Sequence, residues 1–218
     1  MDLRERDGFP PLVVELWGPA ALFTRPEAKV ERVSYPVMTP SAAVGVLEAI
    51  FWKPEFTWQV VAIEVLAPIR EGRVRRNETT QVVPRDSALR GERVNTADHR
   101  TQRASTILLD VRYRVHAHVV LRDHATDPVP KYRDQFRRRV DRGACFSQPY
   151  FGTREFPAAF GPASEAAPVP LSGDLGVMLH SIKHGKDGHN PQSSWFTARL
   201  DHGVLHVPEQ GITAGGTT

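Results

Sequence analysis

One short loop of the sequence combines the side chains that bind RNA phosphates and bases. Arg25, Lys29 and Arg32 can contact phosphates, and the ring of Tyr35 can stack on a base. A solvated charged loop would have the same composition, so the loop alone leaves both interpretations open.

A pair of histidines could supply the acid–base chemistry of RNA cleavage. His116 and His118 alternate with apolar residues between 106 and 121, which predicts a strand with both rings on one exposed basic face. Metal-free cleavage must activate the 2′-hydroxyl, neutralise the phosphorane and protonate the leaving 5′-oxygen, and His, Lys, Tyr and Arg can share these tasks. Histidines that merely face solvent on a strand are the alternative.

The sequence lacks the residues that several other kinds of functional site require. Cys145 is the single cysteine, which excludes a disulfide framework and a multi-thiolate zinc site. The sequence has no P-loop, no Gly-rich dinucleotide fingerprint and no Gly-x-Ser-x-Gly elbow. Two imidazoles without a nearby carboxylate or thiolate form a weak metal site. We therefore expect no metal and no cofactor.

Composition indicates a folded protein with many arginines. The 218 residues are 40% hydrophobic and 24% charged, and 23 of the 28 basic residues are arginine. Arginine grips phosphates with a planar fork, although a GC-rich genome would produce the same bias. No apolar run approaches the roughly 20 residues that span a bilayer, and the N-terminus is charged where a signal peptide would be apolar. We expect a soluble cytoplasmic protein without membrane contact.

The elements predict an α+β fold. Strands are expected at 12–17, 57–69 and 106–121, with a fourth at 145–156, and helices are expected from Pro40 to Phe51 and from Pro130 to Gly143. Thr39 and Pro40 are typical of a helix start, and Gly143 of a helix end. The polar residues 70–105 predict a long basic hairpin or mobile loop.

The order strand, helix, strand, strand, helix, strand is typical of a ferredoxin-like fold, which RNA-recognition modules also use. Residues 1–156 would form this domain. Residues 157–174 are rich in Pro and Ala and predict a linker, and segments 175–182, 195–200 and 204–207 predict a small C-terminal antiparallel sheet. The second domain would therefore be 157–218.

Eight segments, in order along most of the chain, resemble the CRISPR-associated Cas-five family in its type I-C (Dvulg) branch. The segments are 22–27, 29–35, 37–43, 45–54, 74–78, 102–106, 149–157 and 175–179. The resemblance implies a RAMP-type protein that cleaves repeat pre-crRNA without a metal. It also implies that the protein stays on the 5′ handle of the mature crRNA, beside the backbone and large subunits of the Cascade complex, and meets target DNA only through that complex.

The resemblance also implies catalytic positions. The family's tyrosine before Trp-Lys-Pro is Phe51 here, and its Lys-His pair is Lys131-Tyr132. Lys131 would stabilise the phosphorane or the leaving oxygen. Tyr132 would be a weak general base or acid, unless it is simply packed in the helix, and His116 or His118 could substitute for it.

Seven residues are predicted to bind the RNA: Arg25, Lys29, Arg32, Tyr35, Arg75, Arg76 and Arg103. Three functions remain open at this point. The protein could be the endoribonuclease, a non-catalytic subunit that holds the 5′ handle, or a basic structural protein without RNA specificity.

Overall fold

The computed structural model describes residues 3, 5–28, 30–80, 82–93, 95, 97, 99–183 and 192–213. The helices are α1 (Pro40–Ile50), α2 (Arg85–Leu89) and α3 (Val129–Arg142). The strands are β1 (Leu12–Ala21), β2 (Arg32–Val33), β3 (Phe56–Val65), β4 (Glu71–Thr79), β5 (Arg100–Leu121), β6 (Ala159–Gly161), β7 (Gly173–Lys183), β8 (Gln192–Asp201), β9 (Val204–His206) and β10 (Ile212–Thr213).

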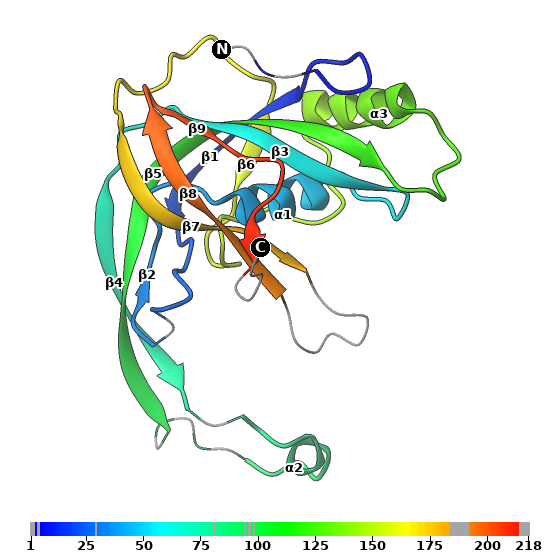
Figure 1. Cartoon of the computed structure of the whole chain (residues 1–218). Helices are drawn as coiled ribbons and strands as arrows, with labels where there is room; N and C mark the ends of the chain where they lie inside the picture. The colour runs from blue at the N-terminus through cyan, green and yellow to red at the C-terminus, as the bar shows by residue number, and fades with distance from the viewer. Residues whose placement is uncertain are drawn as a thin grey trace.

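Within the described residues, these strands form one curled sheet (Figure 1). Its order is β10-β8-β9-β3-β5-β1-β6, while β2 and β4 also pair with β5 and β7 pairs with β8. All pairs are antiparallel except β2 with β5. The predicted α+β class is confirmed. In the same part of the chain, no helix is long and apolar enough to cross a membrane.

The helices α1 and α3 pack on one face of the central strands and enclose the core. Alternate residues of β5, such as Val115 and Ala117, turn toward the helices and are fully buried. Helix α1 starts as predicted, because the Thr39 hydroxyl accepts a hydrogen bond of 3.2 Å from the amide of Ala42. Helix α3 ends as predicted at Gly143, whose φ of 62° is left-handed.

The described residues between 70 and 105 form a hairpin arm that extends from the body, with α2 at its tip (Figure 1). Strand β4 pairs with the first part of β5, from Arg100 to Leu108. At the base of the arm, Asp110 has a φ of 48° and forms an ion pair with Arg70. The predicted long hairpin is confirmed.

The C-terminal strands join the same sheet, because β9 pairs with β3. The division into 1–156 and 157–218 stays a prediction. The strand predicted at 145–156 is wrong: this segment is irregular, and β6 forms next to β1 a few residues later, inside the expected linker.

Gly152 provides a test of this irregular segment. Its φ is +80°, and a Cβ atom there would lie 2.0 Å from the carbonyl oxygen of Leu22. We expect Gly152→Ala to lower the free energy of unfolding by about 2 kcal/mol or more, because the alanine adds both backbone strain and a backbone clash. Thermal unfolding should show a Tm lower by roughly 4–8 °C.

The matched control is Gly45→Ala within α1, where an added Cβ meets nothing within 4 Å. Alanine should stabilise this helix by about 0.5–1 kcal/mol. Equal Tm values for the two variants would contradict the close approach of Gly152 to the carbonyl oxygen of Leu22.

Candidate functional site

Three arginines gather at the base of the arm around one carboxylate. Strand β2 lies beside β5 with Arg32 at Ser105, and Arg76 faces Arg103 across the β4–β5 ladder. Glu78 lies 3.5 Å from Arg32, 3.5 Å from Arg103 and 4.0 Å from Arg76. We call Arg32, Arg76, Glu78 and Arg103 the arm cluster.

The arm cluster keeps an excess of positive charge at the surface. Arg76 has a second carboxylate, Glu155, and donates to the Ser105 hydroxyl at 3.2 Å. The side chains of Arg32 and Arg103 remain 34% and 33% exposed. Two carboxylates cannot neutralise three guanidinium groups, so the cluster can contact phosphates. The structure thus brings together three of the predicted RNA-binding residues.

The other predicted RNA-binding residues are dispersed. Arg75 pairs with Ala104 and therefore lies on the opposite face of the ladder from Arg76. Arg25 lies beside the strand β2, where its amide donates to the carbonyl of Val33 at 2.8 Å. Lys29 lies outside the described residues.

The stacking role predicted for Tyr35 needs correction. Its ring is 1% exposed, and the Arg25 guanidinium lies 4.9 Å from the ring centroid. Burial raises the pKa of the Tyr35 hydroxyl, and the nearby Glu27 carboxylate adds to this rise. An RNA base cannot stack on a ring that is already buried. Tyr35 instead supports the position of the Arg25 guanidinium.

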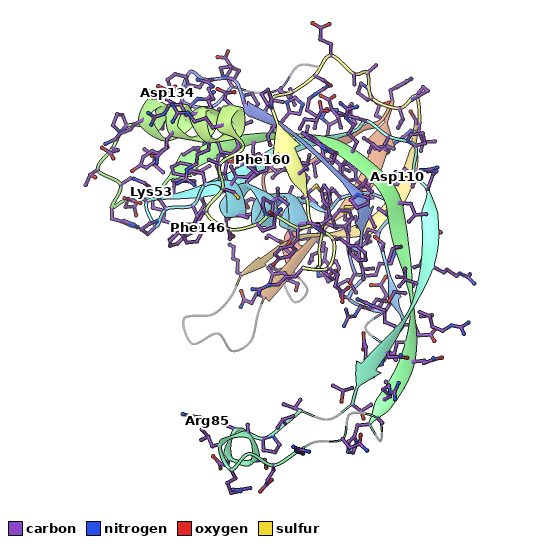
Figure 2. The ribbon with its side chains drawn as sticks, turned by 180° about the vertical axis from the view of Figure 1, so that it is seen from behind. Lys53, Arg85, Asp110, Asp134, Phe146 and Phe160 are labelled. Atoms are coloured by element: carbon purple, nitrogen blue, oxygen red, sulfur yellow. The ribbon has the colours of Figure 1, made fainter. Side chains whose placement is uncertain are left out.

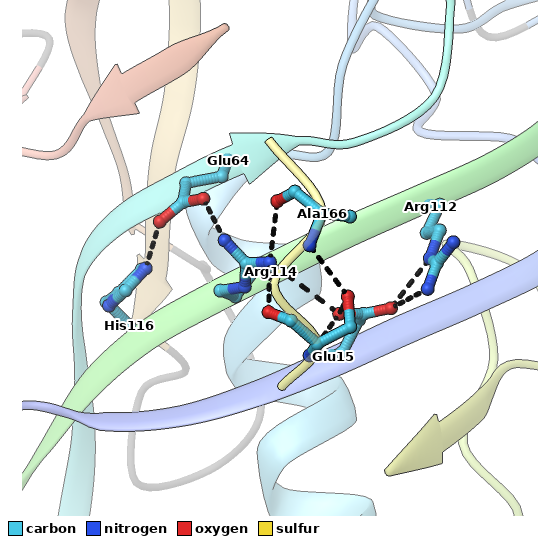
Figure 3. A network of polar contacts seen from close by, with 7 residues as sticks. Glu15, Glu64, Arg112, Arg114, His116 and Ala166 are labelled. Atoms are coloured by element: carbon cyan, nitrogen blue, oxygen red, sulfur yellow. Dashed lines mark hydrogen bonds and ion pairs between the residues drawn. The ribbon is translucent and has the colours of Figure 1, made fainter. Parts of the chain in front are cut away.

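The exposed face predicted for His116 and His118 is also wrong, since both residues are buried. His116 Nε2 lies 2.6 Å from Glu64, and Arg114 bridges Glu64 at 2.5 Å and Glu15 at 3.8 Å (Figure 3). Burial lowers the pKa of His116, although its hydrogen bond to Glu64 opposes this effect. The His116 ring is therefore held inside the fold against Glu64 and does not face solvent.

The segment that covers this face follows β6. Arg114 donates to the carbonyl oxygens of Ser164 and Ala166 at 2.7 and 2.8 Å, and the Ser164 hydroxyl donates to Glu15 at 2.7 Å (Figure 3). His118 instead lines a cavity of about 720 Å³ together with residues of β8 and β9, including Trp195 and His206. Neither histidine reaches the surface around α3.

A second basic surface, which we call the α3 surface, surrounds the start of α3 and is formed by Lys53, Asp127 and Lys131. The Lys131 ammonium lies 2.9 Å from Asp127 Oδ1, and its side chain is 60% exposed. This hydrogen bond and the charge of Asp127 raise the pKa of Lys131. Lys131 therefore presents its ammonium to solvent at the start of α3, where Asp127 offsets the unfavourable positive end of the helix dipole.

Tyr132 lies beneath this surface. Its side chain is 0% exposed, and the Lys53 ammonium lies 5.5 Å from the centroid of its ring. The centroid of the Tyr132 ring lies 5.3 Å from that of Phe56, and the Phe56 centroid lies 5.3 Å from that of the buried Phe51. Burial raises the pKa of the Tyr132 hydroxyl, with Glu55 and Asp127 acting in the same direction. These contacts correct the expected role: Tyr132 is a packing residue on which Lys53 rests, and it is not a base exposed to substrate.

Two exposed aromatic residues lie near the end of α1. Trp52 is 47% exposed next to Lys53, and Phe146 is 72% exposed where its amide donates to the carbonyl of Ala49 at 2.8 Å. Figure 2 shows Lys53 and Phe146 on the side of the body opposite Asp110. Lys53 and Trp52 were not singled out from the sequence, although both lie in segment 45–54. Across the described residues, no three His, Cys, Asp or Glu side chains gather as a metal site would require.

Comparisons with known proteins agree on one family. A family model described as CRISPR-associated protein (Cas_Cas5) matches residues 11–208. A protein of Thermus thermophilus named CRISPR pre-crRNA endoribonuclease Cas5d is 44% identical over 216 residues, which cover 91% of this chain and 92% of the relative.

Solved structures share the fold. A crystal structure of a CRISPR-associated protein has a TM-score of 0.66 and 23% identity, covering 91% of each chain. A chain of a CRISPR RNA-guided surveillance complex has a TM-score of 0.52 and 15% identity, covering 94% of this chain and 91% of that one.

Proposed function

Because the chain belongs to the CRISPR-associated Cas-five family, we propose that it cleaves CRISPR repeat pre-crRNA without a metal and then stays on the 5′ handle of the crRNA. It would do so as a subunit of a type I-C Cascade complex, beside the backbone and large subunits, and would meet target DNA through the guide. The order β6-β1-β5-β3 with α1 and α3 on one face supports the ferredoxin-like interpretation of its N-terminal part.

The observation that carries the catalytic proposal is the exposed, charge-fixed ammonium of Lys131. When the 2′-oxygen attacks phosphorus, negative charge grows on the phosphorane and on the leaving 5′-oxygen. An ammonium that Asp127 holds in place can stabilise that charge without reorganising. Lys53, which rests on the Tyr132 ring, adds a second cation at the same surface. Trp52 and Phe146 offer faces for the flanking bases.

The test is incubation of the purified protein with its own repeat RNA in EDTA. The proposal expects one specific cut that leaves a 2′,3′-cyclic phosphate and a 5′-hydroxyl, and no equivalent cut in a scrambled RNA. Cleavage that requires an added divalent metal would contradict the metal-free step. Equal affinity for repeat and scrambled RNA at matched salt would indicate a basic protein without RNA specificity.

A second candidate function is a handle-binding subunit that does not cleave. The observation that favours it concerns two of the catalytic positions that the resemblance implies. Phe51 has no hydroxyl, and the hydroxyl of Tyr132 is buried. The same incubation separates the two functions, because this subunit would bind the repeat tightly and leave it intact.

The arm cluster is expected to bind the RNA backbone. The double variant Arg32→Ala/Arg103→Ala removes two exposed guanidinium groups that Glu78 holds in place. We expect the slope of log affinity against log salt to fall by about 1.4 for two lost contacts with single-stranded RNA. Fluorescence anisotropy with labelled repeat RNA at several salt concentrations measures this slope.

Arg75→Ala is the matched control because it removes the same charge from the opposite face of the ladder. Its slope should differ from that of the unchanged protein by less than about 0.7, which is the change expected for one lost contact. If Arg75→Ala alone changed the slope as much as the double variant, the RNA would follow the other face of the arm.

A further inference from the structure

The loop between β5 and α3 places an imidazole beside the α3 surface. His124 is exposed, and its Nε2 atom lies 3.1 Å from the carbonyl oxygen of Pro54, the residue after Lys53. The amide of Arg122 donates to the carbonyl of Glu55 at 2.8 Å, which ties the same loop to the same turn a second time. His124 is therefore held next to Lys53 and on the loop that leads into Lys131.

The hydrogen bond to Pro54 determines which nitrogen of His124 is basic. A carbonyl oxygen can only accept a hydrogen bond, so Nε2 must carry the hydrogen. In the neutral ring the free lone pair is then on Nδ1. The backbone of the α1–β3 turn thus prepares His124 Nδ1 to receive a proton.

The other described histidines lie elsewhere in the fold. His116 and His118 are buried on β5. His99 belongs to the arm, and the remaining ones are on or beside the C-terminal strands: His180, His202 and His206. Within the described residues, His124 alone combines an exposed ring with a place on the loop before α3.

We propose that His124 is the general base for RNA cleavage at the α3 surface, an inference that rests on the proposed function. His124 Nδ1 takes the proton of the 2′-hydroxyl, and the 2′-oxygen forms a bond to phosphorus while the bond from phosphorus to the 5′-oxygen breaks. Lys131 gives a proton to the leaving 5′-oxygen. Solvent then returns a proton to Lys131 and removes one from His124, so the step balances without a metal or a redox partner.

Charged groups of both signs lie on the elements next to His124, and the test must allow for them. The cations are Arg122 on its own loop, Lys53 on the α1–β3 turn and Lys131 on α3. The carboxylates are Glu55 on the turn, Asp123 and Asp127 on the loop, and Glu48 on α1, which interacts with the charge of Arg122; the buried hydroxyl of Tyr132 is a further titratable group. Variants of His124 itself are therefore more decisive than a single pH profile.

The first variant is His124→Gln, whose amide can still donate to the Pro54 carbonyl but cannot accept a proton near neutral pH. We expect its single-turnover cleavage of repeat RNA in EDTA to be at least about 100-fold slower, with RNA affinity within about twofold of the unchanged protein.

The second variant is His124→Ala, which should regain cleavage activity when imidazole is added. The variants should also differ from the unchanged protein in the pH dependence of the cleavage rate. His206→Gln, an exposed histidine on β9, is the control and should cleave normally.

Each remaining outcome overturns the inference in a recognisable way. If the unchanged protein cleaves and His124→Gln cleaves equally fast with the same pH dependence, the inference fails and the proposed function stands. If the variants lose activity together with Tm, and imidazole restores nothing, His124 is structural. If the unchanged protein binds repeat RNA without cutting it, the proposed function fails and this inference fails with it.

Discussion

Replacing Lys131 with alanine is expected to slow repeat-RNA cleavage by about 100- to 1,000-fold, the usual cost of removing one preorganised donor from an anionic transition state. The side chain is largely solvent-exposed and makes its ion pair with Asp127 on the protein surface, so its loss should leave the fold intact. RNA affinity should change little, because the arm cluster and the aromatic residues near the end of α1 are unaltered. Single-turnover cleavage and binding, measured on the same RNA, separate these two effects.

Two further variants make the result for Lys131 specific. Lys131→Arg keeps a positive charge but changes the position of the donors, so it should recover only part of the lost rate. Lys183→Ala removes an exposed lysine at the end of β7 and should cleave as the unchanged protein does. A Lys131→Ala protein that cut at the original rate would exclude Lys131 from the reaction.

The boundaries of the helices could be predicted because short-range rules determine them. Thr39 caps α1 through the amide of Ala42, and Gly143 ends α3 in a left-handed conformation, as their residue types indicate. The four-residue spacing of Tyr132, Phe136 and Val140 also predicted one packed face, and all three are buried. The catalytic role of Tyr132 conflicted with this spacing, and the packing decides against it.

The exposure of the sheet could not be predicted in the same way. Alternation in β5 separates Val115 and Ala117 from His116 and His118, but it does not say which faces meet water. On the face with the histidines, Ser164 and Ala166 bind Arg114, and residues of β8 and β9 line one cavity with His118; all of these come about 50 or more residues later in the chain. Such long-range contacts leave no signal in the alternation itself.

The grouping of functional residues could not be predicted either, because it also depends on contacts between distant parts of the chain. Arg32, Arg76 and Arg103 are far apart in sequence and meet because β2 and β4 pair with opposite edges of the same strand, β5. Arg75, next to Arg76, turns away for the same reason. His124 was not predicted because the contact that positions it, with the carbonyl of Pro54, joins residues that are 70 apart in the sequence.

Arg114→Met tests the network that covers His116, and we expect it to cost about 3–5 kcal/mol of unfolding free energy. Glu64 and Glu15 have side chains 8% and 2% exposed, and Arg114 is the cation that joins them. Methionine would fill the space but leave these buried carboxylates without that charge. Thermal unfolding near pH 8 should show a Tm lower by roughly 6–20 °C.

Arg112→Met is the matched control for this network, because Arg112 contacts the same Glu15 from a side chain that is 44% exposed. Its cost should stay near about 1 kcal/mol, and equal losses for the two variants would contradict the central place of Arg114. The pH dependence gives a second check. The charge of Arg114 contributes to the lowered pKa of His116, so its removal raises that pKa. In mild acid, His116 can then gain a proton and pair with Glu64, and the loss in Arg114→Met should be smaller near pH 5.5 than near pH 8.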